Sequence, residues 1–369
     1  MKTRDAILAY QELQGDTDTK TLDINVVDPV SAFEIEVECT NGATSNEDNF
    51  ISDIVTNIQV VDGAEVLTSL NMAQLEALHF YKMYTAPALG VSEWADGVQR
   101  HNALLLFGRK LYDPELCLVP TNYRNPQLKV TFNKAAIRAA GATGFASGTN
   151  IKLTVIAKVI EEGATPRGFL MSKIVDSFTS ASSGDRRVEL PLDYSYRMLM
   201  LRCWLEGYDV DEIISDVKLT CDADKFVPID RKLKQLDAWA LGEYGLFEIK
   251  HDVLRAHNTD VRTIVNKEGN SILFPGGQDD GLICIARWQW SSQLHITLLD
   301  HAGSPVGTAK KLHIAERGHA PHATVPIPFG LSDSPDTWLD PRPYGKVELV
   351  LTQATADAVV EVVTEQLRM

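Results

Sequence analysis

The stretch "IISDVKLTCD" at residues 213–222 repeats the pattern of an earlier stretch, "IVTNIQVVDG", at residues 54–63. The offset between them is 159 residues (213 − 54), and the apolar positions 54, 55, 58 and 60 all align with apolar residues. Each copy is followed by a turn, a short strand pattern and a helix pattern, which begins near Asn71 in the first copy and near Asp230 in the second. The order strand, turn, strand, helix therefore occurs twice, which predicts one fold used twice.

Most of the remaining chain alternates polar and apolar residues. In "AFEIEVE" (32–38), Phe33, Ile35 and Val37 fall on one face and the three glutamates on the other, as in a half-buried strand. Similar patterns occur at 53–61, 125–133, 150–160, 196–206, 281–290, 293–300, 346–352 and 358–367. Many short strands separated by Asn-Gly, Asp-Gly and Gly-Gly turns are typical of sandwiches and barrels.

Helical periodicity is confined to three segments. One is N-terminal, about Asp5 to Leu13, where Ala6, Ala9 and Leu13 give a weakly apolar face. The other two are "NMAQLEALHFYKMY" (71–84) and "DRKLKQLDAWAL" (230–241), whose apolar residues recur at near-helical spacing. We therefore expect a chain of strands with a few short helices.

The chain divides at "EEGATPRG" (161–168), where two glycines and a proline break the strand patterns. Each side holds seven or eight predicted strands, as a jelly roll of two packed four-stranded antiparallel sheets requires. The predicted fold is all-β: two tandem eight-stranded antiparallel jelly rolls with a few short helices. The predicted domains are an N-terminal helix or arm at 1–20, a first jelly roll at 21–164 and a second at 165–369.

Composition restricts the possible partners. The chain has 369 residues, 44% hydrophobic and 23% charged, as expected for a globular protein of two domains. Its formal charge of −15 repels phosphate backbones, so no direct nucleic-acid binding is expected. No apolar run is long enough to span a membrane, and the N-terminus lacks a signal-peptide pattern, which predicts synthesis in a cytoplasm.

A metal site would have to come from the histidine-rich stretch "KKLHIAERGHAPHATV" (310–325), which contains His313, Glu316, His319 and His322. Cupin enzymes, which also use jelly rolls, hold their metal with closely spaced histidines and a carboxylate. A strand would place His313 and Ile314 on opposite faces, and the first half offers only His79 and His101. We interpret these histidines as surface or loop residues and predict no metal, cofactor or catalytic residue.

Other chemical signals are weak. The five cysteines have no CxxC spacing and are expected to be free, mostly buried thiols: Cys39, Cys117, Cys203, Cys221 and Cys284. The acidic groups at 208–213 and 277–281 are interpreted as solvated turns, and no phosphate-binding or nucleophile-elbow motif occurs. Trp288 and Trp290 share a strand face and fit either a sandwich core or a platform for stacking sugars.

Four stretches carry a resemblance to a known family: "NFISDIVTNIQVVDGAEVLTSL" (49–70), "FGRKLYDPELCLVPTNYRNPQLKVTFN" (107–133), "VELPLDYSYRMLMLRCWL" (188–205) and "IISDVKLTCDADKFVPID" (213–230). Together with the tandem layout, they resemble the double-jelly-roll viral major capsid proteins of the adenovirus and tectivirus lineage. The similarity is greatest to the compact proteins of membrane-containing bacteriophages of the corticovirus type. It extends from about residue 20 to the C-terminus.

The resemblance implies a structural role in the virion and no enzymatic activity. Three chains would form a trimer, a pseudo-hexameric capsomer of six jelly rolls that tiles an icosahedral capsid, around an internal membrane. Partners would be neighbouring capsomers, minor capsid or vertex proteins and, through the N-terminal helix, the membrane. The loops 85–103 and 301–345 are candidates for contacts between subunits.

Two alternatives from other functional classes stay open at this point. One is a carbohydrate-binding spike or lectin-like module, which would require Trp288 and Trp290 to be exposed. The other is an enzyme on tandem jelly rolls, a bicupin or a glycosidase, which would require a bound metal or a pair of carboxylates in a cleft.

Overall fold

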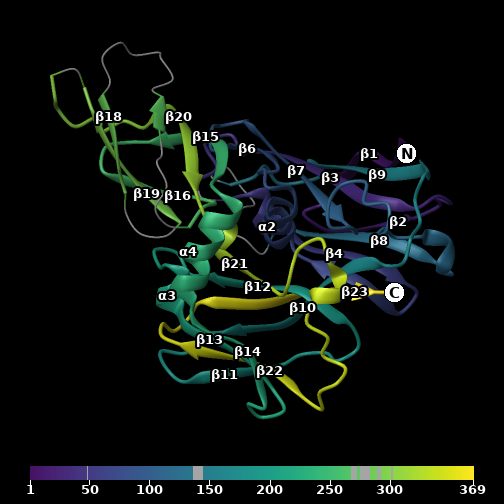
Figure 1. The fold of residues 1–369 in the computed structure, drawn as a ribbon. Coiled ribbons are helices and arrows are strands. Elements are labelled where there is room, and N and C mark those ends of the chain that lie inside the picture. Colours follow the sequence, from purple (N-terminus) through teal and green to yellow (C-terminus); the bar gives the residue numbers. More distant parts are fainter. Residues whose placement is uncertain (48, 136–143, 267–271, 275–282, 289–291, 301) are drawn as a thin grey trace.

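A computed structural model gives the fold of the chain (Figure 1). It describes residues 1–369 except 48, 136–143, 267–271, 275–282, 289–291 and 301, and it does not describe the side chains of 272–274 and 283–288.

The elements of the first half are β1 (Lys2–Gln14), β2 (Thr17–Asp23), β3 (Val30–Thr40), α1 (Ile51–Ile54), β4 (Val55–Asp62), β5 (Glu65–Leu70), α2 (Met72–Met83), β6 (Ala88–Ser92), β7 (Val98–Leu106), η1 (Pro120–Asn122), β8 (Pro126–Asn133) and β9 (Ile151–Glu162). Those of the second half are β10 (Phe169–Thr179), β11 (Asp185–Glu189), β12 (Ser195–Trp204), α3 (Val210–Ile213), β13 (Ile214–Cys221), β14 (Phe226–Lys232), α4 (Leu233–Tyr244), β15 (Phe247–Arg255), β16 (Thr259–Arg262), β17 (Ile272–Phe274), β18 (Ile283–Trp288), β19 (Gln293–Leu299), β20 (Lys310–Gly318), η2 (Pro321–Ala323), β21 (Thr324–Pro328), η3 (Pro335–Thr337), β22 (Val347–Gln353) and β23 (Val359–Arg368).

Eight strands of the first half form the two layers of an antiparallel sandwich. One layer has the order β9-β3-β7-β6 and the other β2-β8-β4-β5, and β1 extends the first layer by pairing with β9. Alternate side chains point inward from both layers, so Ile35, Val130 and Leu153 are fully buried in one core. This is the predicted jelly roll with one added strand.

The second half repeats this arrangement. One layer has the order β10-β23-β12-β21, in which β10 takes the place of β1, and the other has the order β11-β22-β13-β14. After β15 the chain adds a small sheet, β16-β19-β18, and then returns through β20, which pairs with β15. The predicted fold class, two tandem antiparallel jelly rolls, is confirmed.

The two halves join edge to edge through parallel strand pairs. β5 pairs with β10, and β6 pairs with β15, so the sheets continue from one jelly roll into the other. Helix α2 lies between the two sandwiches (Figure 1). The largest core cluster crosses this junction, because it includes Met198, Met200 and Val363 of the second half.

The repeat that began the sequence analysis is a structural repeat. α1 and β4 in the first half match α3 and β13 in the second at an offset of 159 residues (210 − 51). β5 and α2 match β14 and α4 at an offset of 161 (233 − 72), because the turn after β13 is two residues longer. The short helices α1 and α3 were not predicted.

The predicted N-terminal helix is wrong. Residues 2–14 form strand β1, which is antiparallel to β9 from Lys2 to Gln14. Of three irregularities in the pairing, the two after Ile7 and after Ala9 insert extra residues into β1 and interrupt the period-two alternation. The apolar residues of β1 therefore recur at three- and four-residue spacing, as in a helix. The segment is nevertheless a strand, because it pairs with β9.

Each half also contains a tight Phe-Gly corner where the chain leaves β7 or β21. Gly330 has a φ of +67°, and a Cβ there would lie 2.2 Å from the carbonyl oxygen of Thr337. We expect Gly330→Ala to lower the free energy of unfolding by about 2 kcal/mol or more, because the backbone conformation and the close contact both disfavour a side chain.

Chemical denaturation checks this, with Gly242→Ala as the matched control. Gly242 lies in α4 with open space around it, so alanine there should raise the free energy of unfolding by about 0.5–1 kcal/mol. Equal effects of the two substitutions would contradict the corner geometry.

Candidate functional site: the junction between the two jelly rolls

Helix α2 is enclosed on all sides at the junction. Every residue from Met72 to Lys82 is buried, including the charged Glu76 and Lys82. Its first turn is closed by a capping box, in which the side chains of Asn71 and Gln74 each accept a hydrogen bond from the other's backbone N–H. A helix with buried charges needs an ionic partner for each, and the partners come from both jelly rolls.

Glu76 binds one histidine from each half. Its Oε1 lies 2.7 Å from Nδ1 of His101 on β7, and its Oε2 lies 2.6 Å from Nε2 of His322 in η2. Burial alone would raise the pKa of Glu76, but the two histidines outweigh it and lower the pKa to about 2. Glu76 is therefore an ionised carboxylate that links the two sandwiches.

Lys82 forms the second link, at the other end of α2. Its Nζ lies 3.0 Å from Glu365 on β23 and donates a hydrogen bond to the carbonyl oxygen of Leu106. Burial lowers the pKa of Lys82 to about 8, although Glu365 opposes the shift. Arg197 donates to the same carboxylate at 2.9 Å, so Glu365 has two cationic neighbours.

A third group ties the start of α2 to the second half. The Glu361 carboxylate on β23 accepts hydrogen bonds from the side chains of Asn71 and Gln74 and from Arg202, the last at 2.9 Å. The N-terminus of the helix thus contacts a negative charge, which also suits its dipole.

His251 occupies the parallel junction between β6 and β15. Its two ring nitrogens each lie 3.5 Å from a carboxylate, one of Glu93 and one of Glu316. Glu93 also pairs with Arg255, and Glu316 accepts from the backbone N–H of Val265 at 2.8 Å. Burial opposes protonation, but the two carboxylates raise the pKa of His251 to about 9.

The histidine-rich stretch was interpreted as surface or loop residues, and His319 and His322 do lie in the connection between β20 and β21, but they are buried and not on the surface. His313 alternates with the buried Leu312 and Ile314, as the strand pattern predicted, but His319 and His322 are buried. His319 binds Asp237 of α4 at 2.9 Å, which repeats in the second half the contact of Glu76 with His101. Asp237 and Glu76, the partners of the two buried histidines, are distant from them in the sequence, so no local sequence pattern predicted these contacts.

The other sequence signals find structural roles or lie outside the described residues. Asp209 precedes α3, where Glu212 accepts a hydrogen bond from its backbone N–H. The buried free thiols are Cys39, Cys117, Cys203 and Cys221. In the described part of the chain, no group of three or more His, Cys, Asp or Glu residues is arranged to hold a metal ion. The acidic group at 277–281, the thiol of Cys284 and the side chains of Trp288 and Trp290 are not described.

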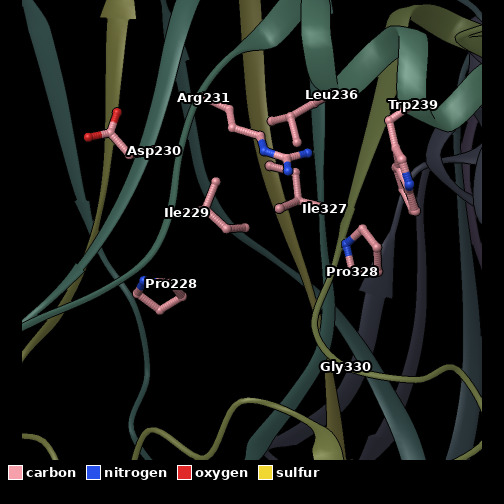
Figure 2. Close-up of a pocket in the computed structure, with 9 residues that line it drawn as sticks. All are labelled: Pro228, Ile229, Asp230, Arg231, Leu236, Trp239, Ile327, Pro328 and Gly330. Carbon is pink, nitrogen blue, oxygen red and sulfur yellow. The ribbon is translucent and has the colours of Figure 1, made fainter.

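One surface groove lies away from these ion pairs, beside strand β14 (Figure 2). This β14 groove has a volume of about 480 Å³ and is lined by Pro228, Ile229, Leu236, Trp239, Pro328 and Gly330. It opens between the edge strand β14, the end of β21 and helix α4. The lining is mixed, because Asp230 and Arg231 line the groove together with the apolar side chains (Figure 2).

Comparisons with solved structures show that the fold is shared with viral capsid proteins. The major capsid protein P2 of bacteriophage PM2 superposes with a TM-score of 0.52 at 10% identity, over 100% of this chain and 98% of that one. A chain of Sulfolobus Turreted Icosahedral Virus gives 0.58 at 12% identity, over 99% and 90%. The PBCV-1 virus capsid gives 0.56 at 9%, over 99% and 93%. No family model and no curated protein sequence matches the chain.

We expect Glu76→Gln to lower the free energy of unfolding by about 3 kcal/mol, because it removes the charge that both buried histidines face. Denaturation at fixed protein concentration measures this, with the exposed Glu248→Gln as control, for which a change within about 0.5 kcal/mol is expected. A Glu76→Gln protein as stable as the control would mean that the charge of Glu76 contributes nothing to the junction.

His251 should give the fold a defined pH dependence. Its pKa is raised, so its stabilising contribution is full below about pH 6.5 and is lost as the pH rises through about 9. In thermal unfolding, the stability of the wild-type protein relative to His251→Gln should fall by on the order of 2–3 kcal/mol between about pH 6.5 and 9.5. This comparison removes the opposite contribution of Lys82, whose pKa is lowered to about 8 and which therefore adds stability as the pH rises. In His251→Gln this part of the pH dependence should vanish; an unchanged slope would assign it to other groups.

Proposed function

We propose that the protein is the major capsid protein of an icosahedral virus and has a structural role in the virion. The observation that carries the proposal is the extent of the structural match: both jelly rolls, in tandem order, superpose on proteins described as capsid components over at least 90% of each chain. Three chains then form a trimer whose six jelly rolls make a pseudo-hexameric capsomer.

The internal architecture supports a role in assembly. The same sandwich occurs twice, joined by parallel strand pairs and by the buried ion pairs around α2, so each chain presents two similar building blocks in a fixed relation. Two similar blocks in each of three identical chains fill a nearly sixfold position. The predicted division into an arm at 1–20, a first jelly roll at 21–164 and a second at 165–369 remains part of the proposal.

Neither alternative function is favoured by a specific observation. The carboxylates at the junction are engaged by histidine, lysine and arginine, as in the Glu76 and Glu365 groups, and those groups lie in the core and not in a cleft. The side chains of Trp288 and Trp290, on which the carbohydrate-binding hypothesis depended, lie outside the described residues.

The proposed partners need one correction. Contact with an internal membrane was expected through an N-terminal helix, but residues 2–14 form β1. No described helix is both long and apolar enough to cross a membrane. An internal membrane is therefore retained only as an implication of the resemblance, while neighbouring capsomers and minor capsid proteins remain the proposed partners.

The mass of the purified protein in solution tests the proposal. Light scattering should give a trimer, three times the 40.8 kDa of one chain, and electron microscopy of the same sample should show particles with a hexagonal outline. A stable monomer or dimer at concentrations well above those in an infected cell would overturn it.

A further inference from the structure

Strands β1 and β10 occupy equivalent places in the two halves. β1 flanks β9 as β10 flanks β23, and both pairs are antiparallel. β9 pairs with β3 in the same register in which β23 pairs with β12. When the two halves are aligned in this register, Ala6 of β1 corresponds to Lys173 of β10. Both strands also have an irregularity at the same point, after Ile7 and after Ile174, which supports this alignment.

In the first half, β10 closes an open edge of the sandwich. Lys173 is paired with Ser69 of β5 in parallel orientation, and the backbone N–H of Leu170 donates to the carbonyl oxygen of Phe107 at 2.7 Å. β10 thus lies beside β5, the edge strand of one layer, and against the end of β7 in the other layer. With this cover from the second half, α2 is completely buried.

The second half has the same edge without this cover. Asp230 of β14 corresponds to Ser69, because each pairs with the equivalent residue of the preceding strand, and Phe329 corresponds to Phe107. β14 is the last strand of its sheet in the described part of the chain. The β14 groove includes Asp230 and the two neighbours of Phe329, Pro328 and Gly330, so by this correspondence it lies where β10 runs in the first half.

Helix α4 shows the same difference from α2. α2 is buried all round, whereas one face of α4 is exposed, including Gln235, Ala238, Trp239 and Glu243. Trp239 is 37% exposed and borders the groove. The second jelly roll covers the outer face of α2, whereas no part of the same chain covers the equivalent face of α4 in the described residues.

The strand equivalent to β10 is itself exposed. β1 ends its sheet, and its apolar side chains Ile7, Tyr10 and Leu13 are 65%, 68% and 58% exposed. Exposed edge strands with apolar side chains favour pairing with another chain. In Figure 1, β1 and the N-terminus lie on the opposite side of the molecule from α4 and β14, so one chain does not bring these surfaces together.

We propose that strand β1 of a second copy of this chain docks in parallel beside β14, in the β14 groove and against α4, reproducing between subunits the contact that β10 makes with β5 and α2 within one chain. Ala6 of the incoming copy then lies opposite Asp230. The proposal rests on the trimeric capsomer of the proposed function and specifies which surfaces meet. A head-to-tail contact of this kind generates a ring when it closes.

Charge pairing at the equivalent positions agrees with this contact. Lys82 of α2 corresponds to Glu243 of α4, and Glu365 of β23 corresponds to Lys158 of β9. The buried ion pair Lys82–Glu365 within the chain therefore has a counterpart between subunits in Glu243 and Lys158, with the signs exchanged; within its own chain Lys158 also pairs with Asp5 and Glu34. Opposite charges at equivalent positions are complementary in both interfaces.

Paired cysteines test the contact in the untagged full-length protein. Ala6→Cys combined with Asp230→Cys, treated with a short bis-maleimide, should give covalently closed trimers on a denaturing gel. Ser69→Cys with Lys173→Cys is the positive control, because that pair is adjacent within one chain and should lose its thiols without any gain in mass. Ala6→Cys with Ser182→Cys, an exposed turn, is the negative control.

The outcomes separate this proposal from the proposed function. Trimers in solution together with several-fold more cross-linking of the Ala6–Asp230 pair than of the negative control would support both. Trimers without that difference would overturn the docking of β1 on β14 and leave the trimer standing. Absence of trimers would overturn the proposed function itself.

A charge reversal gives a second readout that does not depend on cysteines. Glu243→Lys should weaken the trimer about tenfold, because it places a second positive charge near Lys158 of the neighbouring copy. Glu189→Lys, on the exposed strand β11, is the matched control and should leave the mass unchanged; an equal effect of both single reversals would overturn the assignment.

Discussion

The structure depends on the burial of one charged helix between two sandwiches. A carboxylate or an ammonium group in a protein core costs several kcal/mol unless it is paired, and α2 brings one of each into the junction. Glu76 is held by a histidine from each half, and Lys82 by a carboxylate of the second half. Neither jelly roll alone supplies partners for both charges. The ion pairs between the halves, as well as apolar packing, therefore fix the relative position of the two jelly rolls.

Much of this fold could be predicted from the sequence because its determinants are local. Alternation in "AFEIEVE" identified β3, and the helical spacing in 71–84 and 230–241 identified α2 and α4. The doubled stretch at 54–63 and 213–222 identified the repeat, since equal patterns at equal spacing require equal elements. Turn residues then placed the breaks between strands, and the two layers followed from the number of strands.

The features that were missed depend on partners distant in the sequence. β1 is a strand because β9 offers it a free edge, and its bulges hide the alternation that would have identified it. His322 is buried because Glu76 lies beside it across 246 residues of sequence, and His319 because of Asp237. The three- and four-residue spacing led to an incorrect helix in the first case. In the second case the Pro-containing stretch was correctly interpreted as a connection between strands, but its burial was missed.

The small sheet β16-β19-β18 has a consequence for symmetry. Between β6 and β7 the chain needs only residues 93–97, whereas between the equivalent β15 and β20 it inserts residues 256–309. The small sheet packs on β15 and β20, because Val261, Leu294 and Ile296 share a core cluster with Val253 and Leu312. In the proposed trimer, an insertion present in only one of the two jelly rolls would mark alternate positions of the six, so that the capsomer has threefold and not sixfold symmetry. Because both jelly rolls belong to one chain, every such trimer would keep this alternation, whereas a ring of six separate jelly rolls would not ensure it.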